Sequence, residues 1–165
     1  MAISEVYDGV RPYKQISLVK NFIFWVENIS SGKNLRNAIF VRPFKKERVV
    51  GQNLIGDIFF IKSNFHGYGG KSYKCFLYKN EIYIIWIDQI TKSLWGQTFV
   101  INIDNNNNNN FLVSKNSPKQ ITKPYECNYD SCFVLINGVK LFGLCESDEK
   151  DFLFSVDINK YNQKL

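Results

Sequence analysis

The sequence predicts an all-β protein, namely a partial β-propeller of about three blades of antiparallel strands. The first observation is a unit that recurs three times, beginning at Asn21, Asn80 and Asn137. These starts are 59 (80 − 21) and 57 (137 − 80) residues apart, and a fixed period built from strands is typical of propeller blades. The second is the abundance of Phe, Tyr and Ile, with 16% aromatic residues, which suits pleated strands. The third is that no stretch of about ten or more residues shows helical periodicity.

The three units follow the same order. An Asn at the end of a turn precedes a short apolar strand, an acidic residue closes that strand, and a polar turn leads to a second strand. The units read NFIFWVENISSGKNLRNAIFV, NEIYIIWIDQITKSLWGQTFV and NGVKLFGLCESDEKDFLFSV. Their acids are Glu27, Asp88 and Glu146, and their second strands start near Leu35, Leu94 and Phe152. Such units cannot bury their faces alone and depend on their neighbours.

The first half of the chain is expected to alternate strands with turns rich in Gly, Pro, Asn and Ser. Pro43 should end the hydrogen-bond ladder of its strand, because proline has no N–H to donate. The expected elements are an irregular lead-in over Met1–Tyr13, strands over Gln15–Glu27 that meet at Lys20-Asn21, a turn over Ser30–Asn34, a strand over Leu35–Phe44, a loop with a short strand in KKERVVGQNLIG, and a strand over Asp57–Lys62.

The second half opens with a Gly-rich loop and a hairpin whose turn is Lys79-Asn80. The six asparagines Asn105–Asn110 are interpreted as an expanded surface loop, or local disorder, between two blades. Residues Val113–Tyr129, with two prolines, form an extended connection, and the strand pattern resumes near Cys132. We treat 1–165 as a single incomplete propeller domain, because closed propellers use about 4 to 8 blades.

The net charge of +6 permits attraction to anionic partners. The basic residues are scattered over predicted turns, so we interpret them as solvated loop tips and expect neither nucleic acid nor membrane as a partner. The longest apolar run, Ile82–Ile87, is too short to span a bilayer, and no signal peptide is recognised. These two observations predict a cytoplasmic protein with reduced thiols. The cysteines lack zinc-site spacing, so no metal or cofactor is expected; they are Cys75, Cys127, Cys132 and Cys145.

No motif for catalysis is complete. GGKS (Gly69–Ser72) lacks the first glycine of a phosphate loop, since that position is Phe65, and it precedes a strand where the motif needs a helix. No G-x-S-x-G nucleophile elbow occurs. The one general-base candidate of the usual kind is His66, interpreted as a hydrogen-bonded loop histidine, and nothing in the sequence activates the thiol of Cys75.

The recurring acids and tryptophans are interpreted as structural. Because the acids Glu27, Asp88 and Glu146 occupy equivalent strand ends, they are expected to accept hydrogen bonds at turns. A glycosidase pair is the less favoured interpretation of them. Trp25 and Trp86 sit in matching strands and are expected to pack between blades, although tryptophans could also form a surface for peptide or sugar.

Six short segments stand out by their order and spacing, namely FWVEN (Phe24–Asn28), VRPF (Val41–Phe44), NFHGYGGKSY (Asn64–Tyr73), IIWID (Ile84–Asp88), SLWGQ (Ser93–Gln97) and LFGLCESDEKDFLFSVDIN. Together they resemble the start of the propeller domain in the prolyl oligopeptidase family. The closest branch is the acylaminoacyl-peptidase and dipeptidyl-aminopeptidase-like one, and the WID…LWxQ pattern is similar to that of cyanobacterial members. The signature positions, which we interpret as structural, are His66, Gly67, Tyr68, Gly69, Gly70, Trp86, Asp88, Trp95 and Gln97.

The resemblance covers about Gln15 to Asn159 and departs from the family pattern at three places. Lys62 and Asn64 flank the place of the signature arginine, Lys71 replaces the third glycine, and the asparagine run is an insertion. The resemblance implies a longer serine peptidase, in which the propeller caps an α/β-hydrolase domain and filters substrates by size. No residue here matches that domain, so no catalytic residue is carried over and the chain is not expected to be an enzyme by itself.

Two functions from different classes stay open, with a third beside them. The chain is a non-catalytic, truncated or split propeller segment that serves a separately encoded hydrolase domain, or it is a stand-alone propeller-like module that binds peptides or proteins. The third is a small hydrolase that uses His66. Three blades in an arc leave exposed sheet faces and open strand edges, so self-association is expected.

Overall fold

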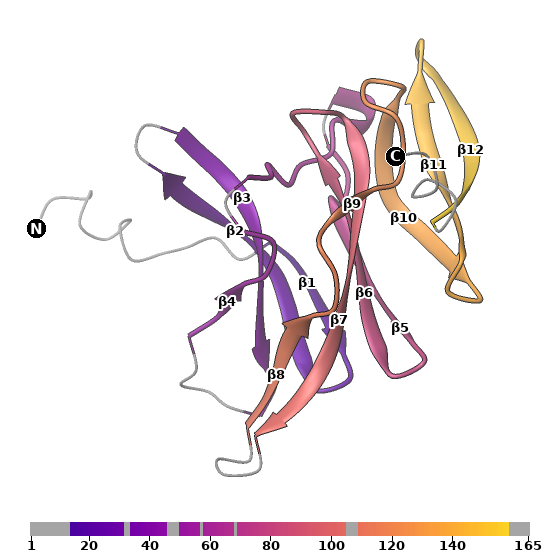
Figure 1. Cartoon of the computed structure of the whole chain (residues 1–165). Helices are drawn as coiled ribbons and strands as arrows, with labels where there is room; N and C mark the ends of the chain where they lie inside the picture. The colour runs from indigo at the N-terminus through magenta and orange to yellow at the C-terminus, as the bar shows by residue number, and fades with distance from the viewer. Residues whose placement is uncertain are drawn as a thin grey trace, which may run out of the picture.

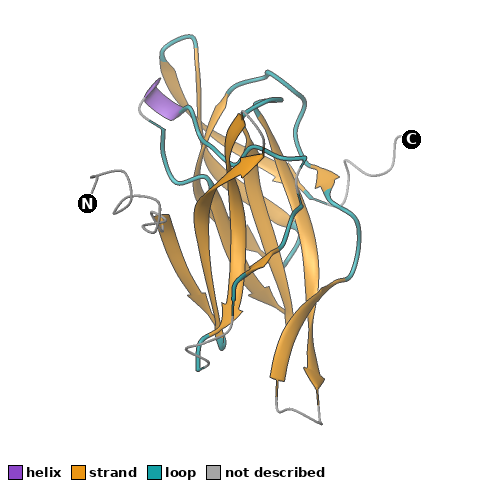
Figure 2. Cartoon of the chain, turned by 90° about the vertical axis from the view of Figure 1, so that its left-hand side faces the viewer, coloured by secondary structure: helices purple, strands orange, loops and turns teal. Residues whose placement is uncertain are grey.

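The computed structural model describes residues 14–31, 34–45, 50–56, 58–67, 69–104 and 109–158. These residues form three antiparallel sheets that follow one another along the chain and lie side by side, as Figure 1 shows from indigo through magenta to yellow. We call them sheets A, B and C. The axes of the strands in all three sheets are roughly aligned, and a short 3-10 turn lies at one end of the molecule (Figure 2). The chain is therefore all-β, with the arrangement of a partial β-propeller.

Sheet A has the strand order β1-β2-β3-β4. Its strands are β1 (Lys14–Val19), β2 (Phe22–Ser31), β3 (Asn34–Pro43) and β4 (Gln52–Asn53). The turn at Lys20-Asn21 lies where the sequence predicts it, with Val19 opposite Phe22. Pro43 is the last residue of β3, as expected.

Sheet B has the order β5-β6-β7-β8, and β9 pairs with β7 beyond that path. Its strands are β5 (Tyr73–Tyr78), β6 (Glu81–Asp88), β7 (Ser93–Asp104), β8 (Asn109–Ser114) and β9 (Lys119–Gln120). Lys79 and Asn80 both have positive φ, 46° and 66°, which is the geometry of a tight two-residue hairpin turn. The Lys79-Asn80 turn of the predicted hairpin is confirmed.

Sheet C has the order β10-β11-β12. Its strands are β10 (Asn128–Ile136), β11 (Lys140–Ser147) and β12 (Lys150–Asp157). The turn that begins at Asn137 joins β10 to β11, so each repeat of the sequence supplies the central and following strands of one sheet. The 59- and 57-residue spacings are thus the spacings of the three sheets along the chain.

Two apolar clusters hold the sheets together, and β6 contributes to both. Ile82, Ile84 and Trp86 join a cluster with residues of sheet A, such as Phe24. Ile85 and Ile87, which alternate with them, join a second cluster with residues of sheet C. Because side chains alternate between the faces of a strand, β6 must be apolar on both faces, which explains the run Ile82–Ile87.

Two predicted elements are wrong. Residues 58–60 are not in a strand, and the segment has one isolated bridge, between Ile61 and Asp88. Its backbone instead joins two sheets, since the Ile61 N–H donates to the Asn37 carbonyl at 3.1 Å and the Lys62 N–H donates to the Ile87 carbonyl at 3.2 Å. The run of asparagines does not separate two blades, because β7 and β8, the strands before and after residues 105–108, pair with each other in sheet B.

The same region corrects the prediction for the connection that follows. Asn109 and Asn110 are the first residues of β8, while 105–108 lie outside the described residues. The predicted connection Val113–Tyr129 contains the end of β8, all of β9 and the start of β10. The strand pattern therefore resumes well before Cys132. Asparagine runs and short strands give little hydrophobic alternation, so sequence alone does not reveal them. The predicted lead-in Met1–Tyr13 lies outside the described residues.

Candidate functional site

The glycine-rich loop of sheet B makes polar contacts with sheet C. Its 3-10 turn spans Phe65–Gly67 and holds His66 at a φ of 51°. The His66 N–H donates to Glu146 Oε2 at 2.8 Å. The His66 ring lies 3.2 Å from Asp151 Oδ1 through Nε2 and 3.8 Å from Glu146 Oε1 through Nδ1. The histidine that sequence reasoning picked out therefore bridges the loop to β11 and β12.

This arrangement lacks the parts of a nucleophilic site. Within the described part of the chain, the polar contacts of His66 go to carboxylates, and none goes to a Ser, Thr or Cys side chain. The neighbouring Ser63 donates its hydroxyl to the Tyr129 carbonyl at 2.6 Å, which ties the loop to β10. A general base needs a proton donor within hydrogen-bond reach. These contacts hold two sheets together and supply no activated nucleophile.

The glycines of the loop allow close approach of the backbone. Gly69 has a φ of +78°, and a Cβ there would lie 2.7 Å from the Ser63 carbonyl oxygen. A Cβ on Gly70 would lie 2.3 Å from Asp130 Oδ1, in β10. Gly67 also has positive φ, 70°. Tyr68 of the same signature lies outside the described residues.

The GGKS segment is not a phosphate loop. Ser72 donates both its N–H, at 2.7 Å, and its hydroxyl, at 3.0 Å, to Gln15 Oε1 of sheet A. The next residue, Tyr73, begins strand β5. A phosphate loop opens a helix whose N-terminus faces the phosphate, so the strand confirms that the motif is not of this kind.

The remaining signature residues lie inside sheet B. Trp86 is fully buried and meets Phe59 edge-on, with ring centroids 5.1 Å apart. Trp95 also contacts Phe59, at 4.9 Å, and donates its indole N–H to Ser93 Oγ at 3.0 Å. Gln97 is buried, and its Nε2 donates to Ser114 Oγ at 2.6 Å and to the Asn116 carbonyl at 2.7 Å. Each of these contacts stabilises the sheet.

The two tryptophans of matching strands have different surroundings. Trp86 packs between sheets A and B, as the sequence predicts. Trp25 does not pack between blades, which corrects the expectation for it. Its ring stacks on Phe40 of the neighbouring strand, with centroids 5.9 Å apart. It lies on the face of sheet A opposite Phe24 and Val26, which belong to the cluster with sheet B.

The three recurring acids all accept hydrogen bonds, Asp88 and Glu146 from backbone N–H groups and Glu27 from an indole N–H. Asp88 has the predicted turn role, because it accepts from the N–H groups of Phe60 and Thr91, both at 3.0 Å. Glu27 accepts from the indole N–H of Trp25 at 3.0 Å, and Glu146 accepts from the backbone of His66. All three acids are therefore hydrogen-bond acceptors, and Asp88 is the one that accepts from the N–H of its own turn.

The described cysteines are free thiols, namely Cys75, Cys127 and Cys145. Burial raises the pKa of Cys75 well above its ordinary value. Burial also raises the pKa of Cys145 to about 12, and a hydrogen bond with Cys127 adds to the increase. Both thiols therefore stay protonated at neutral pH, which makes them poor nucleophiles. Over the described ranges, no cluster of three or more His, Cys, Asp or Glu residues could hold a metal ion.

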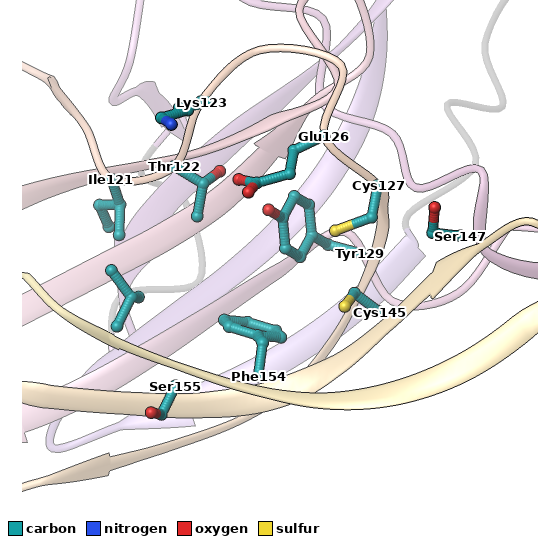
Figure 3. Close-up of a pocket in the computed structure, with 11 residues that line it drawn as sticks. Ile121, Thr122, Lys123, Glu126, Cys127, Tyr129, Cys145, Ser147, Phe154 and Ser155 are labelled. Carbon is teal, nitrogen blue, oxygen red and sulfur yellow. The ribbon is translucent and has the colours of Figure 1, made fainter.

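One cavity, of about 350 Å³, is formed by sheet C and the segment that leads into β10. Figure 3 shows the side chains around it, with the sulfur atoms of Cys127 and Cys145 on one side. The Tyr129 and Phe154 rings meet edge-on in its wall, 5.1 Å apart. Exposed Lys123 and Glu126 also line it, so the cavity joins an apolar wall to charged groups of both signs.

Sequence reasoning did not find this cavity. Its residues come from two segments, around Ile121–Tyr129 and Cys145–Val156, that meet only when sheet C forms. The sequence predicts that the first segment is part of an extended connection. Apart from Tyr129 it has no aromatic residue that packs in the wall, so no pattern along the chain marks it as part of a site.

Comparison with known proteins gives a structural relative and no sequence relative. No family model matches the sequence, and no curated protein matches it. A solved structure of a puromycin-hydrolyzing peptidase from Mycobacterium tuberculosis is similar, with a TM-score of 0.63 and 13% identity. The similarity covers 90% of this chain and 21% of that chain. This likeness shows a shared all-β fold, and the chain spans about a fifth of the peptidase. Over the residues described, no helix is long and apolar enough to cross a membrane.

Proposed function

We propose that this chain is a non-catalytic propeller segment that works with a serine-peptidase hydrolase domain lying outside these 165 residues, as a truncated or split member of the prolyl oligopeptidase family. The observation that carries the proposal is the succession of three sheets, which resembles a peptidase structure over 90% of the chain. The resemblance implies that the segment limits which substrates reach the hydrolase domain. Its partner is then that domain, and it needs no cofactor.

The chemistry of the described residues supports a non-catalytic role. His66 is engaged with Glu146 and Asp151, and the thiols of Cys75 and Cys145 stay protonated at neutral pH. Acyl transfer needs a nucleophile, a base and oxyanion donors held together. The signature residues instead contribute contacts within and between sheets.

The first test is peptide hydrolysis by the purified chain. The expected rate on short chromogenic peptides equals that of buffer, both for the wild-type chain and for His66→Ala. Hydrolysis that His66→Ala abolishes would contradict the proposal and would favour a small hydrolase.

The second test is reconstitution with a hydrolase. The DNA beside the gene is expected to encode a G-x-S-x-G hydrolase domain, which is expressed with and without this chain. Because a propeller filters substrates by size, the chain should slow cleavage of an unfolded protein much more than cleavage of a short peptide. Equal effects on both substrates, or no binding between the two proteins, would count against a gating role.

A second candidate function is peptide binding by a stand-alone module, which the cavity of about 350 Å³ favours. Its aromatic wall and flanking charges suit one apolar side chain of a peptide. Peptides ending in Phe or Leu are titrated while amide signals of Tyr129 and Phe154 are followed by NMR. Phe154→Ala should weaken binding, whereas Ile90→Ala, in the exposed turn after β6, should not change it.

A further inference from the structure

Sheets A and C each have an outer face, which is the face that turns away from sheet B. The sequence repeat makes each outer face equivalent to one of the two faces of sheet B. In β6, Ile85 and Ile87 pack toward sheet C. Adding the repeat spacing of 57 (137 − 80) leads to Phe142 and Leu144 in β11. These two residues alternate with buried Leu141 and Cys145, so they lie on the face of sheet C that turns away from sheet B.

The same correspondence holds at the other end of the described chain. Ile82 and Ile84 of β6 pack toward sheet A. Subtracting the spacing of 59 (80 − 21) leads to Ile23 and Trp25 in β2, which alternate with residues of the cluster between sheets A and B. The outer face of sheet A is therefore equivalent, in the repeat, to the face of sheet B that packs on sheet A.

Both outer faces carry large apolar side chains that solvent reaches. Beside Phe142 and Leu144, the outer face of sheet C presents Val134 opposite Phe142 and Leu153 opposite Leu144, and Leu153 is 84% exposed. On the outer face of sheet A, Trp25 is buried and stacks on Phe40, so the part that solvent reaches is presented by the neighbours of Ile23. These are Leu18, which pairs with Ile23 and is 59% exposed, and Ile16, which is 68% exposed. Contiguous apolar patches of this kind mark interaction surfaces.

We propose that the outer face of sheet C in one copy of the chain packs on the outer face of sheet A in a second copy, as sheet C packs on sheet B within one copy. The contact is head-to-tail, because it joins two different surfaces. The pair of copies then keeps one free outer face of sheet A and one free outer face of sheet C, so association continues into larger assemblies or a ring. This inference goes beyond the proposed function, since it needs no hydrolase domain.

Geometry favours the contact between the outer faces of sheets A and C over a contact between two copies of the same face. Within the chain, sheet A meets sheet B, and sheet B meets sheet C, through opposite faces of successive repeats. A contact between two outer faces of sheet C would place equivalent surfaces together, an arrangement that neither internal interface uses. Pairing through strand edges would leave both apolar faces in water.

The test uses the whole 165-residue chain and two variants, one for each face. Leu153→Asp places a charge on the outer face of sheet C, and Leu18→Asp places one on the outer face of sheet A. Light scattering should give a mass that rises with concentration for the wild-type chain and a monomer of 19.3 kDa for each variant alone. An equimolar mixture has one intact face of each kind available, so it should form a 1:1 dimer and nothing larger.

The matched control is Ile90→Asp, which adds the same charge at an exposed turn residue away from both faces. It should associate like the wild-type chain. Circular dichroism checks the fold of each variant, and Leu153→Ser with Leu18→Ser replaces the pair if aspartate prevents folding. A monomeric wild-type chain, a variant that associates alone, or a mixture that stays monomeric would each overturn the proposal.

Discussion

Gly70 shows how a single residue allows a loop to approach a neighbouring sheet closely. A Cβ at this position would lie 2.3 Å from Asp130 Oδ1 and 2.9 Å from its Cγ. These distances are shorter than real contacts, so any side chain must displace Asp130 or the loop. The glycine is therefore needed for close approach and not for an unusual φ.

We expect Gly70→Ala to lower the free energy of unfolding by about 1–3 kcal/mol, the usual cost of overpacking. In an Asp130→Ala background the clashing atoms are gone, so the same change should cost much less. Urea denaturation of the four proteins in this double-mutant cycle measures the difference. Additive effects of the two changes would show that the close approach is not the cause.

Cys145 links stability to pH at the residue scale. Its pKa rises from an ordinary 9.0 to about 12 in the folded chain. Between these values the unfolded chain has released a proton that the folded chain keeps, so the free energy of unfolding should fall as pH rises from about 9 to about 12. At lower pH both states are protonated, and the effect disappears.

The measurement compares urea denaturation of the wild-type chain and Cys145→Ala across this pH range. The variant lacks the titrating group, so its stability should fall less steeply, although lost packing lowers it at every pH. Tyr73, whose pKa burial also raises, titrates in both proteins and cancels in the comparison. Equal slopes for the two proteins would contradict the role given to Cys145.

At the scale of elements, the short strands β8 and β9 depend on a side chain of β7. Gln97 donates to Ser114 Oγ and to the Asn116 carbonyl, just beyond the end of β8. The Asn116 side chain accepts in turn from the Thr98 N–H at 3.0 Å. Because β9 has two residues, these polar contacts hold the connection against sheet B.

Gln97→Ala should therefore loosen β8 and β9 without unfolding the rest. Losing these hydrogen bonds costs on the order of 1–2 kcal/mol, which corresponds to roughly tenfold faster amide exchange. Hydrogen–deuterium exchange should report this change over residues 111–120 and no change in β2 and β3. Gln120→Ala is the control, since Gln120 Nε2 has no hydrogen-bond partner in the described part of the chain. Faster exchange throughout the chain would contradict a local role.

At the scale of the whole molecule, β6 couples the two apolar clusters. Ile84 belongs to the cluster between sheets A and B, and Ile85 belongs to the one between sheets B and C. Both side chains are fully buried. Because β6 is packed on both faces, unfolding of this strand disrupts both clusters at once.

We therefore expect one cooperative unfolding transition, which Ile84→Ala and Ile85→Ala each shift by about 2–5 kcal/mol. Far-UV circular dichroism and tryptophan fluorescence should give coincident curves for both variants. Leu77→Ala, at an exposed position of β5, should shift the transition much less. Two separate transitions, with each variant moving only one, would show that the clusters are independent.

The candidate site was only partly predictable from the sequence. His66 and the glycines stand out because their types are unusual in a strand-rich chain, and the loop does contact sheet C. Their partners Glu146, Asp151 and Asp130 lie more than fifty residues away along the chain. No local pattern connects them, because packing of one sheet on another brings them together.

The sequence by itself determined the hairpins of the three sheets, since apolar alternation and turn residues such as Lys79-Asn80 act over a few neighbours. Only the tertiary structure decided what covers each face of a sheet. Trp25 and Trp86 occupy matching strands and are both buried, yet Trp86 lies between two sheets, whereas Trp25 lies on an outer face against Phe40 and Gly51. The partner of a side chain depends on which segment lies opposite, and that is a property of the assembled molecule, not of a repeat.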